Sequence, residues 1–352
     1  MDDRGLTRSL VSFAPSARRW PMGVQAGLAM AIPVIVFTLL GDTGLGLQAS
    51  MGAFTALYCG ALSRTDRIRV LPLIGAGFVV SAAAGAALSF SPVTLALGLI
   101  VVGLVAIVLA QGFRLGPPGP MMFTLVYGAA GLITGPAAFG GAGLDRLTLV
   151  ALVAGGTTLA YLLVIAPLVV SSVRRRHGQA TPLRTLFPGL RFDTVSRVVI
   201  ARMSAALILS VAVGALFGAH HGYWITASAL AILSVGHSLR APVIRGVHRV
   251  LGSLVGCLAF LLLSWWSPAG VVLGLVLGTM QLVIEIVVTR HYALALVLIT
   301  PLALTIGTAA ANVDPLDVVG ERILDTLLGA AIAAVVLTVS WLLRRGVKDA
   351  AG

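Results

Sequence analysis

Long apolar segments separated by short polar ones dominate the chain from residue 20 to residue 343. A hydrocarbon core about 30 Å thick is crossed by about 20 residues of α-helix, and most of the apolar segments reach or approach that length. Their glycine and alanine content is typical of helices that pack closely within a membrane. The pattern predicts twelve transmembrane spans: 22–40, 45–62, 70–89, 93–111, 118–135, 147–170, 198–217, 221–239, 248–265, 269–288, 292–310 and 321–343.

Composition places the chain among integral membrane proteins. Hydrophobic residues make up 58% of it, charged residues only 10%, and the mean hydropathy is +1.03, whereas about 25% of the residues of soluble domains are charged. No polar stretch is long enough for a sizeable soluble domain, and no phosphate-binding glycine loop, catalytic triad or metal-ligand cluster is recognisable. We therefore expect no enzymatic activity, no cofactor and no metal site.

The placement of the positive charge predicts the topology. The net charge of +12 could indicate a nucleic-acid-binding protein. If the amino terminus is cytoplasmic, however, all of the 24 basic residues except Arg146 and Arg322 fall on the inner side of the predicted spans. This bias follows the positive-inside rule. We therefore expect a multi-pass protein of the cytoplasmic membrane with both termini in the cytoplasm, and no binding of nucleic acid.

The chain divides into two similar units of six spans. A shift of 176 residues superposes rare charged residues without a gap, and a parallel repeat of this kind has its pseudo-two-fold axis along the membrane normal. We expect a cytoplasmic segment (1–19), a first unit (20–170), an amphipathic basic linker (171–197), a second unit (198–343) and a cytoplasmic tail (344–352), with a substrate path between the units. The matched arginines are Arg64 and Arg240, Arg69 and Arg245, Arg114 and Arg290, and Arg146 and Arg322.

Three segments of the second unit resemble the fusaric acid resistance (FUSC) family of integral membrane transporters. They are HGYWITASALAILSVGHSLRAPVIRGVHRVLGSLVG at 221–256, EIVVTRHYALALVLITPLAL at 285–304, where His291 stands in place of the usual asparagine, and ERILDTLLGA at 321–330. The likeness is strong over 198–343 and weak in the first unit. The resemblance implies export of aromatic carboxylic acids, and the family is more distantly similar to plant aluminium-activated malate channels.

Arg146 and Arg322 are candidates for substrate binding because they occupy equivalent positions on the outer side. A guanidinium can bind a carboxylate through two parallel hydrogen bonds, so a symmetric pair of arginines could coordinate an anion on the axis. The alternative is a local ion pair with the nearby acids Asp145, Glu321 or Asp325.

Glu285 and Asp325 are candidates for proton coupling because each lies within a predicted span of the second unit. A carboxyl group can take up a proton at physiological pH when its surroundings raise its pKa. For Glu285 the alternative is an ion pair with Arg290, with His291 or with a neighbouring inner-loop arginine.

Tyr223, Trp224 and Thr226 begin a span of the second unit and are further candidates for contact with substrate. For the hydroxyls of Thr226 and Ser228, the alternative is a hydrogen bond to the carbonyl of a neighbouring turn.

Four histidines lie next to predicted spans. His220 and His221 precede the Tyr–Trp pair on the outer side, and because no further metal ligands stand at suitable spacing we favour aromatic anchoring at the interface there. His237 and His248 fall in the predicted basic inner loop, where we expect them to be solvated.

The function expected from these features is the export of small organic anions, aromatic carboxylic acids in particular. Its driving force would be proton exchange or the membrane potential, which is worth about 2.3 kcal/mol per charge per 100 mV. A passive anion channel and a non-transporting scaffold or accessory subunit of an envelope complex are the alternatives. The expected partners are the organic anion and the lipid bilayer, with a second copy of the chain or an export subunit left open.

Overall fold

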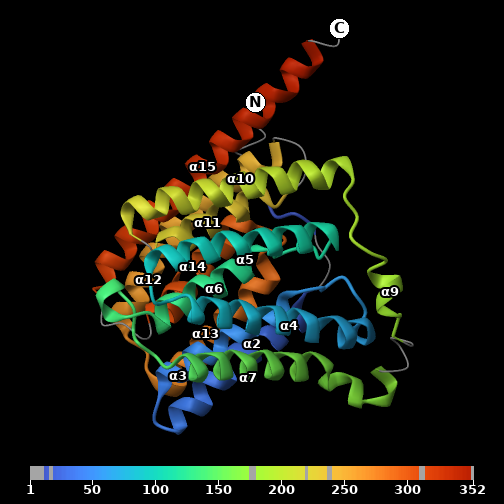
Figure 1. Cartoon of the computed structure of the whole chain (residues 1–352). Coiled ribbons are helices and arrows are strands. Elements are labelled where there is room, and N and C mark those ends of the chain that lie inside the picture. Colours follow the sequence, from blue (N-terminus) through green and yellow to red (C-terminus); the bar gives the residue numbers. More distant parts are fainter. Residues whose placement is uncertain are drawn as a thin grey trace.

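The computed structural model describes residues 12–15, 19–173, 180–218, 221–235, 240–308 and 314–349. Within these residues all regular structure is helical, and the long helices run side by side (Figure 1). The helices are α2 (Trp20–Leu39), α3 (Thr43–Ser50), η1 (Met51–Leu57), α4 (Arg64–Ala87), α5 (Pro92–Gly112), α6 (Met121–Thr134), η2 (Ala137–Phe139), α7 (Arg146–Ile165), η3 (Ala166–Val169), α9 (Leu183–Leu186), α10 (Thr194–Phe217), α11 (His221–Leu233), α12 (Arg240–Trp266), α13 (Gly270–Val287), α14 (Tyr292–Thr308) and α15 (Pro315–Asp349).

The structure confirms a polytopic all-helical membrane protein but gives fewer full-length spans than the apolar pattern predicts. Within the described residues, eight helical segments are long and apolar enough to cross a membrane, in place of twelve. They are α2, α4, α5, α7 with η3, α10, α12, α13 and α15. Three further apolar helices, α6, α11 and α14, coincide with predicted spans but are shorter.

The predicted span at 45–62 is not one helix. α3 passes into the 3₁₀-helix η1, which ends at Leu57, and only turns follow before α4. Arg67 of α4 accounts for this early end, because its Nη2 donates to the carbonyl oxygens of Ala56 at 2.7 Å and Tyr58 at 3.2 Å. Carbonyl groups at a helix end lack partners within the helix, so a buried arginine that binds them stabilises the interruption.

Three spans begin six or more residues earlier than predicted. α4 begins at Arg64 instead of residue 70, α12 at Arg240 instead of 248, and α15 at Pro315 instead of 321. An apolar pattern detects only the part of a helix that suits lipid, whereas the helix itself can continue through polar turns whose long side chains reach water. Consequently Arg245, which precedes the predicted span 248–265, lies on the same helix as Arg249.

Because α12 begins early, His248 also lies in a different environment from the one predicted. It is 7% exposed on α12 and its ring stacks on that of His291, with centroids 5.5 Å apart. The prediction that His248 is solvated is therefore wrong. His220, His237 and the side chain of His221 lie outside the described residues.

The two six-helix units are interlocked. α13 of the second unit packs along α2 of the first, and α5 of the first packs along α10 of the second. One hydrophobic core therefore contains side chains of α2, α4, α7 and α13, and another contains those of α5, α10, α11 and α15. Each core is built from both units, so the boundary between the units runs through the middle of the protein.

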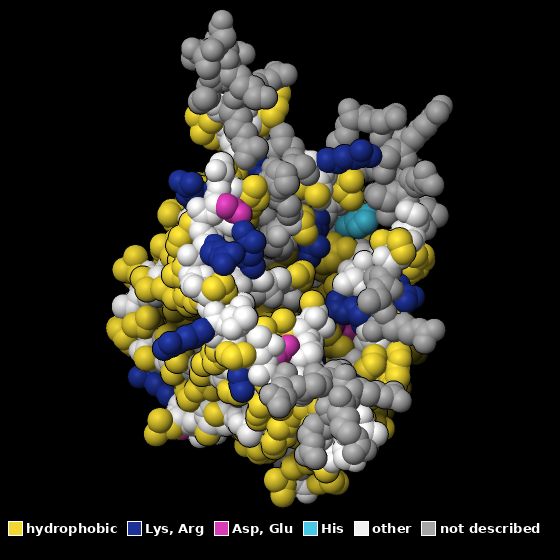
Figure 2. Space-filling view, turned by 90° about the vertical axis from the view of Figure 1, so that its right-hand side faces the viewer, with side chains coloured by type: hydrophobic (Ala, Val, Ile, Leu, Met, Phe, Trp, Pro, Cys, Tyr) yellow, Lys and Arg dark blue, Asp and Glu magenta, His cyan; other side chains and the backbone are white. Residues whose placement is uncertain are grey.

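The bundle has two ends, which we call the inner and the outer face. α4, α6, α12 and α14 begin at the inner face, and α9 lies on this side, at the right of Figure 1. Figure 2 looks onto the inner face and shows Lys and Arg side chains spread over it. This is the end that the charge pattern assigns to the cytoplasm. Its exposed arginines include Arg69, Arg114, Arg184, Arg191, Arg197 and Arg240.

The described part of the basic linker is held against the inner face by hydrogen bonds. The backbone N–H of Thr181 donates to Asp66 Oδ1 at 2.7 Å, and Arg69 Nη1 donates to the carbonyl oxygen of Thr181 at 2.9 Å. The backbone N–H of Arg191 donates to the carbonyl oxygen of Gly112 at 3.0 Å. The linker is thereby attached to the inner ends of α4 and α5.

Asp193 joins this linker to α10. Its Oδ1 accepts the backbone N–H of Ser196 at 2.7 Å, and its Oδ2 lies 2.7 Å from Arg114 Nη2. The hydrogen bonds from Ser196, and then the charge of Arg114, lower the pKa of Asp193. A carboxylate with a lowered pKa stabilises the fold above the pKa of the unfolded chain, and this contribution is lost as the pH falls through the folded value.

We expect Asp193→Asn to lower the thermal midpoint slightly at pH 7 and by less at pH 3. Asparagine still caps the helix but carries no charge, and the stabilisation by the wild-type carboxylate begins to be lost below the pKa of the unfolded chain. The effect is small because the Asp193 side chain is 49% exposed, where solvent screens ion pairs. Thermal unfolding in detergent at both pH values measures the difference, and a deficit that is as large at pH 3 as at pH 7 would contradict the assignment.

Candidate functional site

Three cavities lie in a row between the inner and the outer face. The inner vestibule has a volume of about 810 Å³, the central cavity about 130 Å³ and the outer cavity about 220 Å³. Pro117 lines both the inner vestibule and the central cavity, while Trp224 and Arg322 line both the central and the outer cavity. These shared walls place the three spaces in series.

The central cavity lies at the boundary between the two units. η1 and α6 of the first unit and α11 to α15 of the second contribute to its lining. Four charged side chains are among the lining residues, the three arginines Arg245, Arg249 and Arg322 and the carboxylate of Glu285. The cavity therefore combines apolar helix faces with an excess of positive charge, which suits an organic anion.

Arg322 forms the wall between the central and the outer cavity. It is 2% exposed, and its guanidinium carbon lies 4.1 Å from the centroid of the Trp224 ring. Its Nε and Nη1 are buried and have no hydrogen-bond partner among the described residues. Stacking on an indole stabilises the cation through its face and leaves the donors in the guanidinium plane free. A buried arginine with free donors is costly unless an anion pairs with it.

A second group of cations lies at the inner end of the central cavity. Arg249 Nη1 donates to Tyr292 Oη at 3.2 Å, and its Nη2 donates to Ser228 Oγ at 3.3 Å. Arg245 lies over the ring of Tyr292, with its guanidinium carbon 3.9 Å from the ring centroid. Tyr292 thus contacts one arginine through its face and another through its hydroxyl group.

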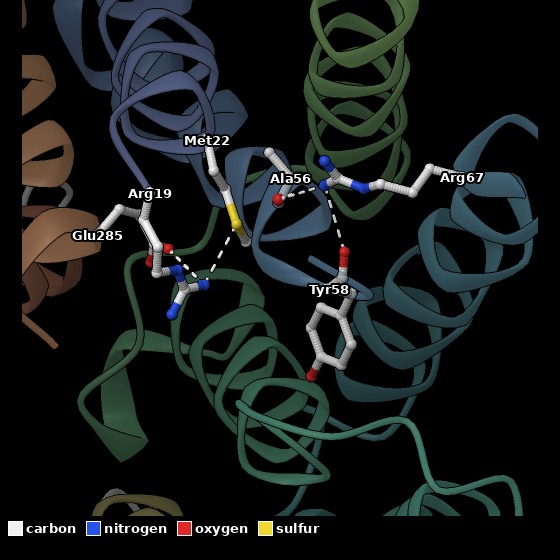
Figure 3. A network of polar contacts seen from close by, with 6 residues as sticks. All are labelled: Arg19, Met22, Ala56, Tyr58, Arg67 and Glu285. Atoms are coloured by element: carbon white, nitrogen blue, oxygen red, sulfur yellow. Dashed lines mark hydrogen bonds and ion pairs between the residues drawn. The ribbon is translucent and has the colours of Figure 1, made fainter. Parts of the chain in front are cut away.

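Glu285 pairs with Arg19, the residue that immediately precedes α2 (Figure 3). Its Oε2 lies 3.0 Å from Nη2 of Arg19, and the same nitrogen contacts the sulfur of Met22 at 3.2 Å. Arg19 lines the inner vestibule and Glu285 lines the central cavity, so the pair lies between them. The predicted alternative of an ion pair is confirmed, with a partner other than Arg290 or His291.

Two short helices end beside the central cavity, one from each unit. The end of η1 is bound by Arg67, as described above, and the end of α11 is bound by Arg245, whose Nε donates to the carbonyl oxygen of Ala231 at 2.8 Å. Phe54 of η1 and Ala231 of α11 both line the cavity. Interrupted helices are typical of the substrate sites of secondary transporters.

The structure separates the two arginines that were predicted to act as a symmetric pair. Arg146 is exposed at the first residue of α7 and lines none of the three cavities, whereas Arg322 lies deep in the protein because α15 begins at Pro315. Asp145 caps α7 by accepting the backbone N–H of Thr148 at 2.8 Å. The two positions that the shift of 176 residues superposes thus differ in burial and in their surroundings.

Three of the other predicted residues meet around the outer cavity. Tyr223, Trp224 and Asp325 line it together with Arg322, and Tyr223 is only 4% exposed. Thr226 is fully buried in α11 and lines none of the three cavities, and its Oγ1 has no hydrogen-bond partner among the described residues. The structure thus places the aromatic pair and Asp325 in the candidate site and leaves Thr226 outside it.

The sequence alone gave no functional role to Arg19, Arg245, Arg249 or Tyr292. The arginines were counted as topology signals, which is their usual meaning at the inner ends of spans. One signal was present, because Arg245 and Arg249 are four residues apart and so share a helix face once α12 is extended through them.

Part of the chain is similar to known proteins. Residues 207–336 match the family model described as "Fusaric acid resistance protein-like". The chain is 33% identical over 108 residues to the uncharacterized membrane protein YvaC of Bacillus subtilis (strain 168), a match that covers 31% of this chain and 17% of YvaC. It is 29% identical over 143 residues to the inner membrane protein YccS of Escherichia coli (strain K12), which covers 40% of this chain and 19% of YccS.

The matched segments thus span less than a fifth of each of these two relatives. No solved structure matches the chain. The family match lies in the second unit, which supplies Trp224, Arg249, Glu285 and Arg322. The chain is therefore a multi-pass membrane protein, and its residues 207–336 are similar to the fusaric acid resistance-like family.

Proposed function

We propose that the protein transports small organic anions, aromatic carboxylates in particular, through the row of three cavities. The observation that carries the proposal is the buried guanidinium of Arg322, which is stacked on Trp224 between two cavities. Two of its nitrogens have no hydrogen-bond partner among the described residues. Such a site offers donors to a carboxylate and an indole to an aromatic ring. The description of the family, which names resistance to an organic acid, points the same way.

The proposed direction is outward from the cytoplasm. The arginine-rich inner face, on which both chain ends would lie, is taken to be cytoplasmic under the positive-inside rule. Cations at the inner vestibule, among them Arg19, Arg114 and Arg191, would concentrate anions there. A membrane potential that is negative inside then favours the exit of an anion without a further energy source.

We also propose that the two units are a duplication with an axis through the central cavity. The helix contacts within the first unit recur in the second: α4 packs on α6 and α7 as α12 packs on α14 and α15, and α2 packs on α3 as α10 packs on α11. The contact between α2 and α13 has its counterpart in that between α10 and α5. This correspondence supports the alignment of the two units in sequence.

We propose Asp325, in preference to Glu285, as the residue that would take up a proton during coupled transport. Asp325 lines the outer cavity beside Arg322, so a proton there would change the charge that meets the substrate. Glu285 is occupied by its ion pair with Arg19.

The test is flux in proteoliposomes. Purified protein is reconstituted, a potassium diffusion potential is imposed, and the movement of labelled benzoate is compared with that in protein-free liposomes. We expect potential-dependent flux that saturates with benzoate concentration. Flux that rises linearly would indicate the passive channel, and flux equal to that of protein-free liposomes would contradict the proposal and favour a scaffold or accessory role.

A further inference from the structure

We infer that the inner end of the central cavity is a second anion-binding site, formed by Arg245, Arg249 and Tyr292, which takes the carboxylate of the transported acid before Arg322 does. This inference rests on the proposed function for its ligand. It rests on the charges, hydrogen bonds and position of the three side chains for its location.

The charges around the central cavity are unbalanced at this end. The cavity is lined by three guanidinium groups and one carboxylate, that of Glu285, which is paired with Arg19 at 3.0 Å. Among the described residues, no carboxylate forms an ion pair with Arg245 or Arg249. Buried charges in proteins are normally paired. An anion from outside the chain would supply the missing charge.

The hydrogen bonds of Arg249 leave room for such an anion. Arg249 is 3% exposed, and its partners are two neutral hydroxyl groups, those of Tyr292 and Ser228, at 3.2 and 3.3 Å. Its Nε has no hydrogen-bond partner among the described residues. A carboxylate carries a full negative charge that the two hydroxyl groups lack, so it attracts the guanidinium more strongly than they do, and it can accept two parallel hydrogen bonds. A carboxylate would therefore bind here in preference to the hydroxyls.

Tyr292 adds a donor to the two cations. Its hydroxyl oxygen accepts a hydrogen bond from Arg249, and a phenol that accepts in this way can still donate its own proton. Arg245 stacks on the ring face and is further fixed by its bond to the carbonyl of Ala231, so the ring is held in place. The hydroxyl and Arg249 can thus contact one carboxylate from adjacent directions.

The position of this group sets the order of binding. Tyr292 is the first residue of α14, and Arg245 and Arg249 lie in the first turns of α12, so all three are near the inner face. Arg322 stands at the opposite end of the same cavity, near the start of α15. An anion that enters from the inner vestibule meets Arg249 first. The cavity of about 130 Å³ then lets it pass to Arg322 without leaving the site.

The experiment measures binding at the inner site in a variant that lacks the Arg322 guanidinium. Benzoate binding is measured by calorimetry on protein in lipid nanodiscs, with Arg322→Ala as the starting variant. We expect Arg322→Ala to retain measurable benzoate binding. Adding Arg249→Gln should weaken this binding about tenfold or more, because a charge-assisted bond is lost. Adding Tyr292→Phe, which keeps the ring beneath Arg245, should weaken it several-fold.

Arg240→Gln is the matched control, since Arg240 lies on the same helix but is exposed at its first residue. It should leave benzoate binding unchanged in the Arg322→Ala background. Loss of all binding in Arg322→Ala alone, or equal binding with and without the Tyr292 and Arg249 substitutions, would overturn the inference. Binding without any flux in the wild-type protein would count against the proposed function and leave this site standing.

Discussion

Replacing Arg322 by alanine is expected to lower potential-driven benzoate flux about a hundredfold, because losing the charged partner of a buried carboxylate costs about 2–5 kcal/mol. The guanidinium is the shared wall of the central and outer cavities, so every anion that crosses by this route must pass it. Its unpartnered Nε and Nη1 are the donors that the substrate would use. The measurement is initial flux in proteoliposomes.

Arg146→Ala provides the matched control for this experiment. Arg146 occupies the position that corresponds to Arg322 in the first unit but is exposed and lines none of the three cavities. Its removal should change flux less than about twofold, as is usual for an exposed charge. Arg322→Lys should fall between, since an ammonium group keeps the charge but not the planar stack on Trp224. An equal loss of benzoate flux in Arg146→Ala and Arg322→Ala would contradict the role assigned to Arg322.

Flux would also be lost if Arg322→Ala failed to fold. The structure predicts instead that this variant is at least as stable as the wild-type protein. Removing a buried charge whose donors are partly unpartnered relieves a desolvation cost. The thermal midpoint of Arg322→Ala should therefore equal or exceed that of the wild-type protein. A variant that is stable but inactive places the role of Arg322 in function rather than in folding.

The apolar pattern was a good guide to the long helices and a poor one to their ends. Spans such as α5 and α13 are predominantly apolar, so hydropathy locates them. The segment at 45–62 is equally apolar, yet it is interrupted by a side chain from another helix, that of Arg67, which binds its carbonyl groups. Such an interruption depends on a tertiary contact, and a local pattern cannot reveal it.

The candidate site also contains residues that the sequence identifies and residues that it does not. Tyr223, Trp224, Arg322 and Asp325 could be selected from the sequence because polar residues within spans are rare and expensive. Arg249 could not, because a basic residue next to a span normally reports topology. Its role depends on α12 beginning at Arg240, which brings it inside the protein.

The partner of Glu285 was unpredictable for a related reason. Neighbouring residues in the sequence, Arg290 and His291, were the natural candidates, but the ion pair is made by Arg19, which immediately precedes α2. That contact exists because α2 packs along α13. The packing of these two helices therefore decides part of the chemistry of the site.

Substituting Gly27 by leucine is expected to destabilise the protein strongly by separating α2 from α13. A Cβ atom at Gly27 would lie 2.6 Å from the carbonyl oxygen of Gly278, and one at Gly278 would lie 2.8 Å from that of Gly27. Gly23 and Gly274 belong to the same contact, so each helix presents two glycines four residues apart, an arrangement typical of close helix pairs in membranes. Overpacking usually costs about 1–3 kcal/mol, and here backbone atoms would have to move.

Gly155→Leu is the matched control, because a Cβ atom at Gly155 of α7 would have no atom within 4 Å. Leucine is a better helix former than glycine by about 0.5–1 kcal/mol, so the control should be neutral or slightly stabilised. Thermal unfolding followed by size-exclusion chromatography distinguishes the two variants, and equal midpoints would show that the α2–α13 contact can relax.

Since Arg19 immediately precedes α2 and Glu285 lies near the end of α13, a Gly27→Leu protein that still folds should also lose their ion pair. The central cavity would then open to the inner vestibule, and benzoate flux should no longer saturate.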